Sequence, residues 1–209
     1  MEYEVRYYYP ISKKEEIEEI LSKFGELKKS LRTYEKTIQF NHCDERYNFY
    51  SKEVDGRFRF RISSNEKESK CKLSWKKRLK DTTDDLVNKE EEKEVNIPFD
   101  DKDNFLYIIS NVMKFPVVES YERYRTTYSN EDIEISIDEY PFGLALEIEN
   151  KSTDKDPMEV VADWTKKMNL DINNSYRLSW DDKYKELCKE QGKEVFSEVA
   201  FDKDMPEIK

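Results

Sequence analysis

The sequence predicts an α+β protein that is mainly β: a closed antiparallel barrel of eight strands with helices packed outside it. Two observations carry this prediction. Short stretches in which polar and apolar residues alternate with period two recur along most of the chain. Few helical stretches separate them, and many short antiparallel strands with few long crossovers favour a barrel or a strongly curled sheet.

Length and composition limit the chain to one folded domain. It has 209 residues, of which 40% are charged and 36% hydrophobic. Such a polar composition would suggest disorder, but 14 Tyr, 11 Phe and 3 Trp supply large side chains for a core. We expect one domain over residues 1–195, followed by a C-terminal tail over residues 196–209.

Nine segments alternate between polar and apolar residues and are predicted strands. They cover residues 2–9, 37–40, 47–52, 57–63, 71–78, 91–97, 117–128, 133–138 and 144–149. No internal repeat and no Pro-, Gly- or Ser-rich linker divides the chain. The very polar residues 78–92 are therefore predicted to form a hairpin loop rather than a domain boundary.

Four segments are predicted helices, at residues 12–25, 100–115, 156–169 and 180–192. Ser12 and Glu15 have the spacing of a capping box at the start of the first, and Gly25 is a stop signal at its end. The third begins with Asp156 as a cap and Pro157 in the first turn.

Charged side chains gather on one face of the predicted strands, because alternate residues of a strand point to opposite sides of a sheet. Arginines and lysines concentrate on three middle strands, at 57–63, 71–78 and 117–128. Pairs of glutamates occupy the first strand and the last. For one strand, the ordinary interpretation is a charged face that meets solvent. The segregation across strands favours instead a barrel whose interior is a basic trough flanked by four carboxylates.

Such a trough suits a polyphosphate together with a divalent metal. Guanidinium forks hold phosphate oxygens with paired hydrogen bonds. Carboxylates hold Mg²⁺ or Mn²⁺, which are hard cations that prefer oxygen ligands. The Glu-x-Glu pairs at residues 2–4 and 147–149 therefore predict two metal clips from opposite ends of the chain that can meet across a barrel.

Six motifs, in order along residues 1–188, resemble those of the CYTH superfamily, also called triphosphate tunnel metalloenzymes. They are EYEVR, RFRIS, KLSWK, YERYRTTY, SIDEYPFGLALEIEN and NNSYRLSW. The family includes thiamine triphosphatases, inorganic triphosphatases and class IV adenylate cyclases. The resemblance implies an antiparallel tunnel of eight strands with helices outside.

The resemblance also implies roles for individual residues. The implied metal ligands are Glu2, Glu4, Glu147 and Glu149. The implied phosphate-binding residues are Arg59, Arg61, Lys76, Arg123 and Arg125. The implied catalytic residues are Arg6, Lys76 and Asp138.

Two positions depart from the family pattern. Arg6 replaces a lysine that is thought to help activate water in the hydrolases of the family. Arginine does not lose its proton near neutral pH, which argues against a general base at this position. Ser136 stands where some members carry a further acidic residue, and Glu134 on the same strand face is placed to compensate.

Three classes of function fit these features. The first is a metal-dependent hydrolase of inorganic triphosphate, thiamine triphosphate or a nucleoside triphosphate, in which water attacks the terminal phosphoryl group. The second is an adenylate cyclase that makes cyclic AMP from ATP. The third is a non-catalytic binder of phosphorylated ligands. The first is favoured, with a triphosphate-containing small molecule as the partner and Mg²⁺ or Mn²⁺ as the cofactor.

Other partners are disfavoured by charge and hydropathy. A net charge of −10 argues against a nucleic-acid or membrane-surface protein. The chain has no run of 18 apolar residues, and its three cysteines lack CxxC spacing. We therefore expect a cytoplasmic protein with reduced thiols, as a monomer or homodimer. His42, the single histidine, is given no role.

Overall fold

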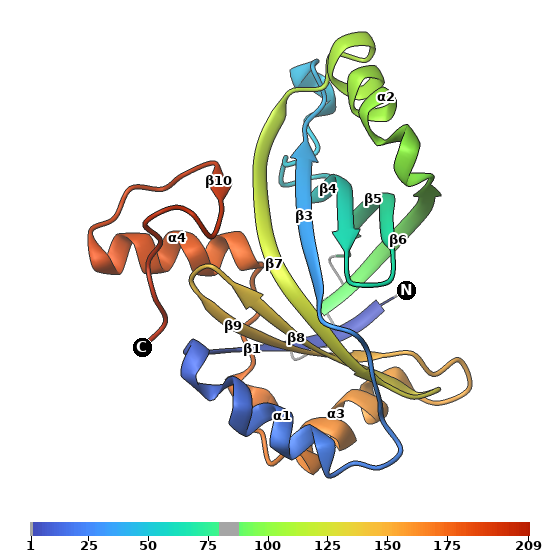
Figure 1. Ribbon diagram of the computed structural model, residues 1–209, viewed down its shortest axis with the longest axis vertical. Coiled ribbons are helices and arrows are strands. Elements are labelled where there is room, and N and C mark those ends of the chain that lie inside the picture. Colours follow the sequence, from blue (N-terminus) through green and yellow to red (C-terminus); the bar gives the residue numbers. More distant parts are fainter. Residues whose placement is uncertain (1, 80–87) are drawn as a thin grey trace.

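One mainly antiparallel sheet forms the framework of the molecule (Figure 1). The computed structural model describes residues 2–79 and 88–209, apart from the side chains of Glu2, Asn88 and Lys89. The long strands are β1 (Glu2–Tyr9), β3 (Thr33–Phe40), β4 (Gly56–Ser64), β5 (Ser69–Arg78), β6 (Asn88–Ile97), β7 (Val117–Ser129), β8 (Ile133–Tyr140) and β9 (Gly143–Asn150). They lie in the order β7-β3-β4-β5-β6-β1-β9-β8, and the short strands β2 (Lys28–Lys29) and β10 (Glu198–Val199) pair with β7.

The eight long strands curl into a half-barrel that is open on one side, so the predicted closed barrel is wrong in this respect. β7, with 13 residues, pairs with β3 along its first part and with β8 along its last part. Between β1 and β6, the described residues form three pairs, Glu2–Glu4 with Asn88–Glu90.

Three predicted elements differ from the structure. β3 begins four residues earlier than expected. Residues 47–52 form turns instead of a strand, because the side chains of Asn41 and Asn48 accept hydrogen bonds from the backbone N–H groups of Phe49 and Tyr50. Within the predicted hairpin loop 78–92, residues 88–92 belong to β6 and residues 80–87 lie outside the described part of the chain.

Within the described ranges, four α-helices accompany the sheet: α1 (Lys14–Ser22), α2 (Lys102–Tyr107), α3 (Pro157–Lys167) and α4 (Trp180–Gln191). The predicted cap of α3 is confirmed, since Asp156 accepts from the N–H groups of Met158 and Glu159. The predicted capping box of α1 is wrong. A 3₁₀ turn over Ile11–Lys13 precedes this helix, and Lys13 at its N-cap makes no side-chain capping bond.

Apolar side chains form three clusters around the sheet. α1 and α3 cover the convex side of β1, β9 and β8, where Leu21 and Val161 pack among side chains such as Ile135 (Figure 1). A second cluster, around Phe40 and Phe60, lies under α2 and the π turn that follows it. α4 packs with a third cluster, which includes side chains of β7, β8 and β9.

Residues 196–209, which the sequence suggested as a tail, pack against the sheet. β10 pairs with β7 in parallel, through Glu198 with Ser120 and Val199 with Tyr121. Val199, Ala200 and Met205 are buried. In the part of the chain described here, no helix is both long and apolar enough to cross a lipid bilayer.

Candidate functional site

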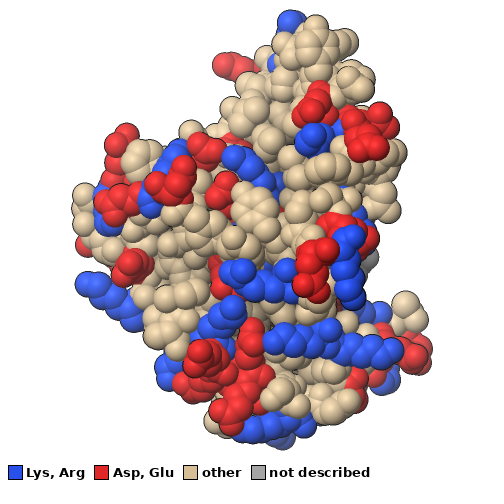
Figure 2. Space-filling model, in the orientation of Figure 1, with Lys and Arg blue, Asp and Glu red and all other residues tan. Residues whose placement is uncertain are grey.

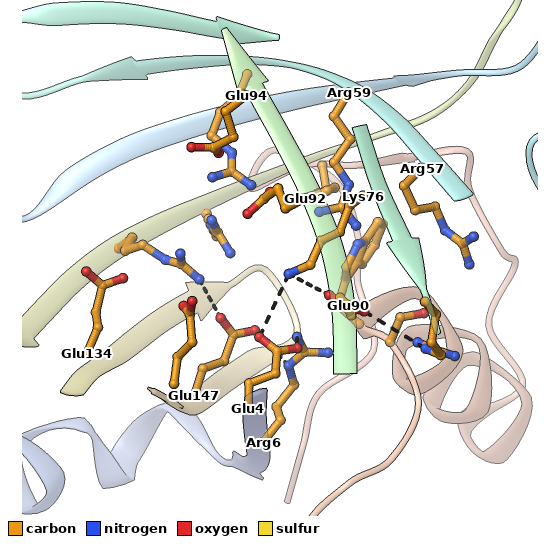
Figure 3. Close-up of a pocket in the computed structure, with 18 of the residues that line it drawn as sticks. Glu4, Arg6, Arg57, Arg59, Lys76, Glu90, Glu92, Glu94, Glu134 and Glu147 are labelled. Carbon is orange, nitrogen blue, oxygen red and sulfur yellow. Dashed lines mark hydrogen bonds and ion pairs between the residues drawn. The ribbon is translucent and has the colours of Figure 1, made fainter. Parts of the chain in front are cut away.

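The concave side of the half-barrel holds a pocket of about 280 Å³ whose wall is largely charged (Figures 2 and 3). Among the side chains that the structure describes, ten of Lys or Arg and eight of Asp or Glu line it. Figure 2 shows basic and acidic side chains gathered together around the hollow on this face. These described side chains carry a small excess of positive charge within a protein whose net charge is −10.

The structure brings together nearly all the residues that the sequence predicts for the site. Nine of them line the pocket: Glu4, Arg6, Arg59, Arg61, Lys76, Arg123, Arg125, Glu147 and Glu149. Asp138 has no exposed surface and lies beneath the arginines of β7. The side chain of Glu2 lies outside the described part of the structure.

One side of the pocket, which we call the basic wall, is built from the inward faces of β4, β3 and β7. Residues directly opposite one another across these strands form three rows. The rows are Arg59–Gln39–Glu119, Arg61–Thr37–Tyr121 and Ser63–Glu35–Arg123. In each row the central residue, from β3, carries a polar side chain between its two neighbours.

The side chains of β3 hold the arginines of the neighbouring strands. Glu35 accepts from Arg123 Nε at 2.7 Å and lies 3.8 Å from Arg61 Nε. Arg61 Nε donates to Thr37 Oγ1 at 3.2 Å, and Arg59 Nε donates to Gln39 Oε1 at 3.4 Å. These arginines are therefore fixed before any ligand arrives.

Burial alone would raise the pKa of Glu35, but the charges of Arg123, Arg61 and Arg125 outweigh it and hold that pKa well below its usual range. Glu35 is thus an anion that anchors the basic wall. Sequence reasoning missed Glu35, Thr37 and Gln39, although every second residue from 33 to 39 is polar and shares one strand face.

Asp138, predicted as a catalytic residue, is placed as a support for the basic wall. Its Oδ1 accepts from Arg125 Nε at 2.6 Å, and its Oδ2 accepts from Arg125 Nη2 at 2.5 Å and from Arg123 Nη1 at 2.6 Å. This bidentate pairing fixes the plane of the Arg125 guanidinium. Asp138 does not line the pocket, so its position suits orientation of the two arginines.

The opposite side, which we call the acidic wall, is built from β1, β9 and β8. Glu149 lies directly opposite Glu4 on one neighbouring strand and Glu134 on the other. Like charges directly opposite in a sheet destabilise it. Lys151 Nζ lies 2.6 Å from Glu149, and Lys76 Nζ lies 3.9 Å from Glu4. This row of three carboxylates attracts cations.

Arg6 links one glutamate from each of the two predicted metal-binding pairs, Glu4 and Glu147. Its Nε donates to Glu147 Oε1 at 2.7 Å and its Nη2 donates to Glu4 Oε1 at 3.0 Å. Glu147 also accepts from Arg125 Nη2 at 2.6 Å, so it joins the acidic wall to the basic wall. Burial would raise the pKa of Glu147, but Arg6, Arg125 and Arg123 hold it well below its usual range.

β6 adds a second group of carboxylates that the sequence analysis did not assign to the site. Figure 3 shows Lys76 directed towards Glu90 and Glu4, and its Nζ lies 2.6 Å from Glu90. Lys72 Nζ donates to Glu94 at 2.7 Å. Lysines of β5 are thus paired with glutamates of β6, and the cations of the basic wall are the arginines of β4 and β7.

Carboxylate oxygens are suitable ligands for a hard divalent cation such as Mg²⁺ or Mn²⁺. Among the side chains that the structure describes, no three His, Cys, Asp or Glu residues are arranged so as to hold a metal ion. Glu4 and Glu147 are instead bound to the guanidinium of Arg6. A metal bound at either of them would have to compete with Arg6, and one bound at Glu149 would have to compete with Lys151.

The N-terminus of α4 also reaches the pocket, through Ser179 and Trp180. Sequence reasoning assigned no site role to either residue. Trp180 packs on Tyr121 with ring centroids 4.3 Å apart. The carbonyl oxygen of Leu178 accepts from Arg6 Nη1 at 3.3 Å. The start of α4 therefore lines the pocket, and Leu178, just before the helix, binds Arg6.

Neither the known family models nor the curated proteins include a match to this sequence. Solved structures do share its fold. The PH1819 protein from Pyrococcus horikoshii OT3 superposes with a TM-score of 0.66 at 23% identity, covering 91% of this chain and 99% of that one.

Two further structures carry functional names. The putative adenylyl cyclase HpAC1 from Hippeastrum, described as having a dominant triphosphatase activity, has a TM-score of 0.58 at 19% identity and covers 93% of this chain and 98% of its own. A putative adenylate cyclase from Vibrio parahaemolyticus has a TM-score of 0.60 at 12% identity, covering 87% and 95%. The resemblance predicted from the sequence motifs is thus confirmed for the fold, which is CYTH-like.

Proposed function

We propose that the protein is a hydrolase that removes the terminal phosphoryl group of a triphosphate bound in the pocket, with Mg²⁺ or Mn²⁺ as cofactor. The observation that carries this proposal is the basic wall, where four guanidinium groups are fixed in place and line one cavity. They belong to Arg59, Arg61, Arg123 and Arg125. The triphosphatase activity described for HpAC1, which has the same fold, supports the same reaction class.

The basic wall would bind the phosphate groups by charge and by geometry. Guanidinium groups donate paired hydrogen bonds to phosphate oxygens. Because Glu35 and Asp138 already fix Arg123 and Arg125, little reorganisation is required when a polyanion binds. Preorganised charges of this kind stabilise the negative charge that shifts during phosphoryl transfer.

The acidic wall would hold the metal. We propose Glu4, Glu149 and Glu134 as the ligand row, because each lies directly opposite the next and all three line the pocket. A divalent cation there would neutralise phosphate charge and position water. The roles predicted for Glu2 and Glu147 as further ligands stay predictions.

Arg6 would act as a permanent cation rather than as a base. It bridges Glu4 and Glu147, and these charges outweigh the effect of burial so that the pKa of Arg6 is raised well above its ordinary value. A side chain that keeps its proton can orient carboxylates or bind phosphate, and the proton that leaves the attacking water must go elsewhere.

A substrate panel tests the proposal. The purified protein is incubated with tripolyphosphate, thiamine triphosphate or ATP, each with Mg²⁺ or Mn²⁺, and free phosphate, diphosphate and cyclic AMP are separated. We expect phosphate release from at least one triphosphate and its loss in Arg125→Ala. Arg46→Ala is the matched control, because this arginine is highly exposed and outside the pocket. No turnover of any substrate would contradict the proposal.

A second candidate is an adenylate cyclase, in which the ribose 3′-hydroxyl of ATP attacks the α-phosphate. The names of the structures from Hippeastrum and Vibrio parahaemolyticus favour it. The same panel separates the two reactions, since only a cyclase yields cyclic AMP with diphosphate. Tight binding of all three compounds without any product would point to the third candidate, a non-catalytic binder.

A further inference from the structure

Glu119 and Tyr121 of the basic wall can both exchange a proton, and of these two Tyr121 is the one that lines the pocket. It lies on the inward face of β7, directly opposite Thr37 of β3, which is itself opposite Arg61 of β4. Its side chain lines the pocket and is 2% exposed. Trp180 of α4 packs on its ring at 4.3 Å, and Tyr140 of β8 lies 5.8 Å away between ring centroids.

Positive charge surrounds this phenol. Arg123 of β7 lies 5.9 Å from the ring centroid, and Arg59 and Arg61 act on the phenol from β4, on the far side of β3. Burial would raise the pKa of Tyr121, but the three arginines and the hydroxyl of Thr37 lower it to about 8. The carboxylates of Glu35 and Asp138 are held by Arg123.

Tyr140 provides an internal contrast. Its hydroxyl also lies beside Arg123, accepting from Nη1 at 3.2 Å. Burial nevertheless dominates at this position and raises the pKa of Tyr140 well above its usual value. Three arginines thus lower the pKa of Tyr121, whereas burial, together with Asp138, raises the pKa of Tyr140.

We propose that Tyr121 is the general acid of the pocket and donates its proton to the diphosphate oxygen that leaves the transferred phosphoryl group. This inference rests on the proposed function. It applies equally to the cyclase alternative, because in both reactions the leaving group is a phosphate oxygen of a diphosphate chain. The neighbouring arginines stabilise the phenolate that forms.

The step balances as follows for hydrolysis. The water oxygen forms a bond to the terminal phosphorus while the bridging P–O bond breaks. The electron pair of that bond goes to the leaving oxygen, which takes the proton from Tyr121 Oη. The proton lost by the former water passes to solvent, and the phenolate is reprotonated from solvent before the next cycle.

Other side chains of the pocket suit this role less well. Arginines do not release protons near neutral pH. Glu147 is held as an anion by Arg6 and Arg125, so it carries no proton to donate. Lys76 is held as a cation by Glu90 at 2.6 Å. The phenol of Tyr121 carries a proton, and the arginines around it stabilise the phenolate that is left when the proton is lost.

Ultraviolet titration tests the acidity of Tyr121 without any turnover. Tyrosinate absorbs where tyrosine does not, so wild type should show ionisation of one phenol around pH 8. Tyr121→Phe should lack this phase. Tyr128→Phe should keep it, because Tyr128 is equally buried on β7 but faces the cluster under α1 and α3. Tripolyphosphate should shift the phase to higher pH, because its negative charge offsets the arginines.

Kinetics then test the role in catalysis. General acids contribute about 10²–10⁴-fold to rate, and because a diphosphate is a good leaving group we expect Tyr121→Phe to lower kcat about a hundredfold with little change in KM. The decline of the wild-type rate above pH 8 should disappear in this variant.

The outcomes distinguish the two proposals. If tripolyphosphate neither binds nor is hydrolysed while the tyrosinate phase is present, the proposed function fails. If hydrolysis occurs but Tyr121→Phe keeps the wild-type rate and pH profile, the role of Tyr121 as the acid is overturned. Circular dichroism of each variant confirms that it is folded, and if Tyr121→Phe does not fold, Thr37→Val replaces it and should raise the pH of the tyrosinate phase.

Discussion

The basic wall and the acidic wall of the pocket hold their charges in opposite ways. In the basic wall Arg59, Arg61, Arg123 and Arg125 are each paired across the sheet with a polar or acidic side chain of β3 or β8, as Arg123 is with Glu35. In the acidic wall Glu4, Glu149 and Glu134 lie opposite one another as like charges. Cations also lie beside the second wall, Arg6 at Glu4 and Lys151 at Glu149, but its like charges stay directly opposite one another. The difference indicates where the polyanion and the metal would each bind.

The largest expected effect is on the support of the basic wall. Asp138→Ala leaves Arg123 and Arg125 without their shared buried carboxylate, and breaking a buried ion pair in this way costs about 3–5 kcal/mol of stability. Glu134→Ala, four residues earlier on β8 and in the acidic wall, removes a like-charge neighbour of Glu149 and should be neutral or stabilising. Urea denaturation of both variants measures this. Equal losses would mean that the walls do not differ.

The comparison also shows what sequence alone could predict. The period-two pattern correctly placed Glu4, Arg59, Arg125 and Glu147 on inward faces, because the face of a strand residue depends only on local alternation. Alternation does not depend on which strands are neighbours. The sequence therefore predicted which residues line both walls better than it predicted how the strands of the walls pair.

What the sequence missed depends on long-range geometry. The open side of the half-barrel could not be foreseen, because closure of a barrel depends on strand tilt and register. Phe49 and Tyr50 lie in an alternating segment that predicts a strand. Their backbone N–H groups instead donate hydrogen bonds to the side-chain oxygens of Asn41 and Asn48, so turns form. The catalytic role predicted for Asp138 stays a prediction, and its burial behind the arginines is the feature that the sequence did not show.

Ligand affinity gives the next largest effect. Arg59→Ala or Arg125→Ala removes charged hydrogen bonds to phosphate, each worth about 1.5–3 kcal/mol, so tripolyphosphate should bind at least about tenfold more weakly. Isothermal titration calorimetry measures the affinity, with Arg46→Ala as the exposed control. A charged face that only met solvent would show no change in either pocket variant.

The pH dependence of stability should report the anchoring carboxylate of the basic wall. The pKa of Glu35 lies below its unfolded value of about 4.3, so its contribution is present above that value and is lost as pH falls below it. The slope for one such group is at most about 1.4 kcal/mol per pH unit. Denaturation at neutral pH and below pH 4 should show a shallower acid loss in Glu35→Gln than in wild type. An identical acid loss would show that Glu35 is not held as an anion.

The smallest effect is expected in the acidic wall, and there its sign depends on the metal. In metal-free buffer Glu149→Gln removes repulsion with Glu4 and Glu134, a gain of about 0.2–1 kcal/mol in stability. The ion pair with Lys151 that it also removes is partly exposed and worth little. With Mn²⁺ added, wild type should gain more stability than the variant, because ligand binding stabilises the folded state and the variant lacks one carboxylate ligand.

Thermal unfolding with and without Mn²⁺ measures the stability of each protein and its gain from the metal, with the exposed Glu190→Gln as control. A variant that is less stable without metal and equally stabilised by Mn²⁺ would show that the row neither repels itself nor binds the cation, and the acidic wall would then be an ordinary charged surface.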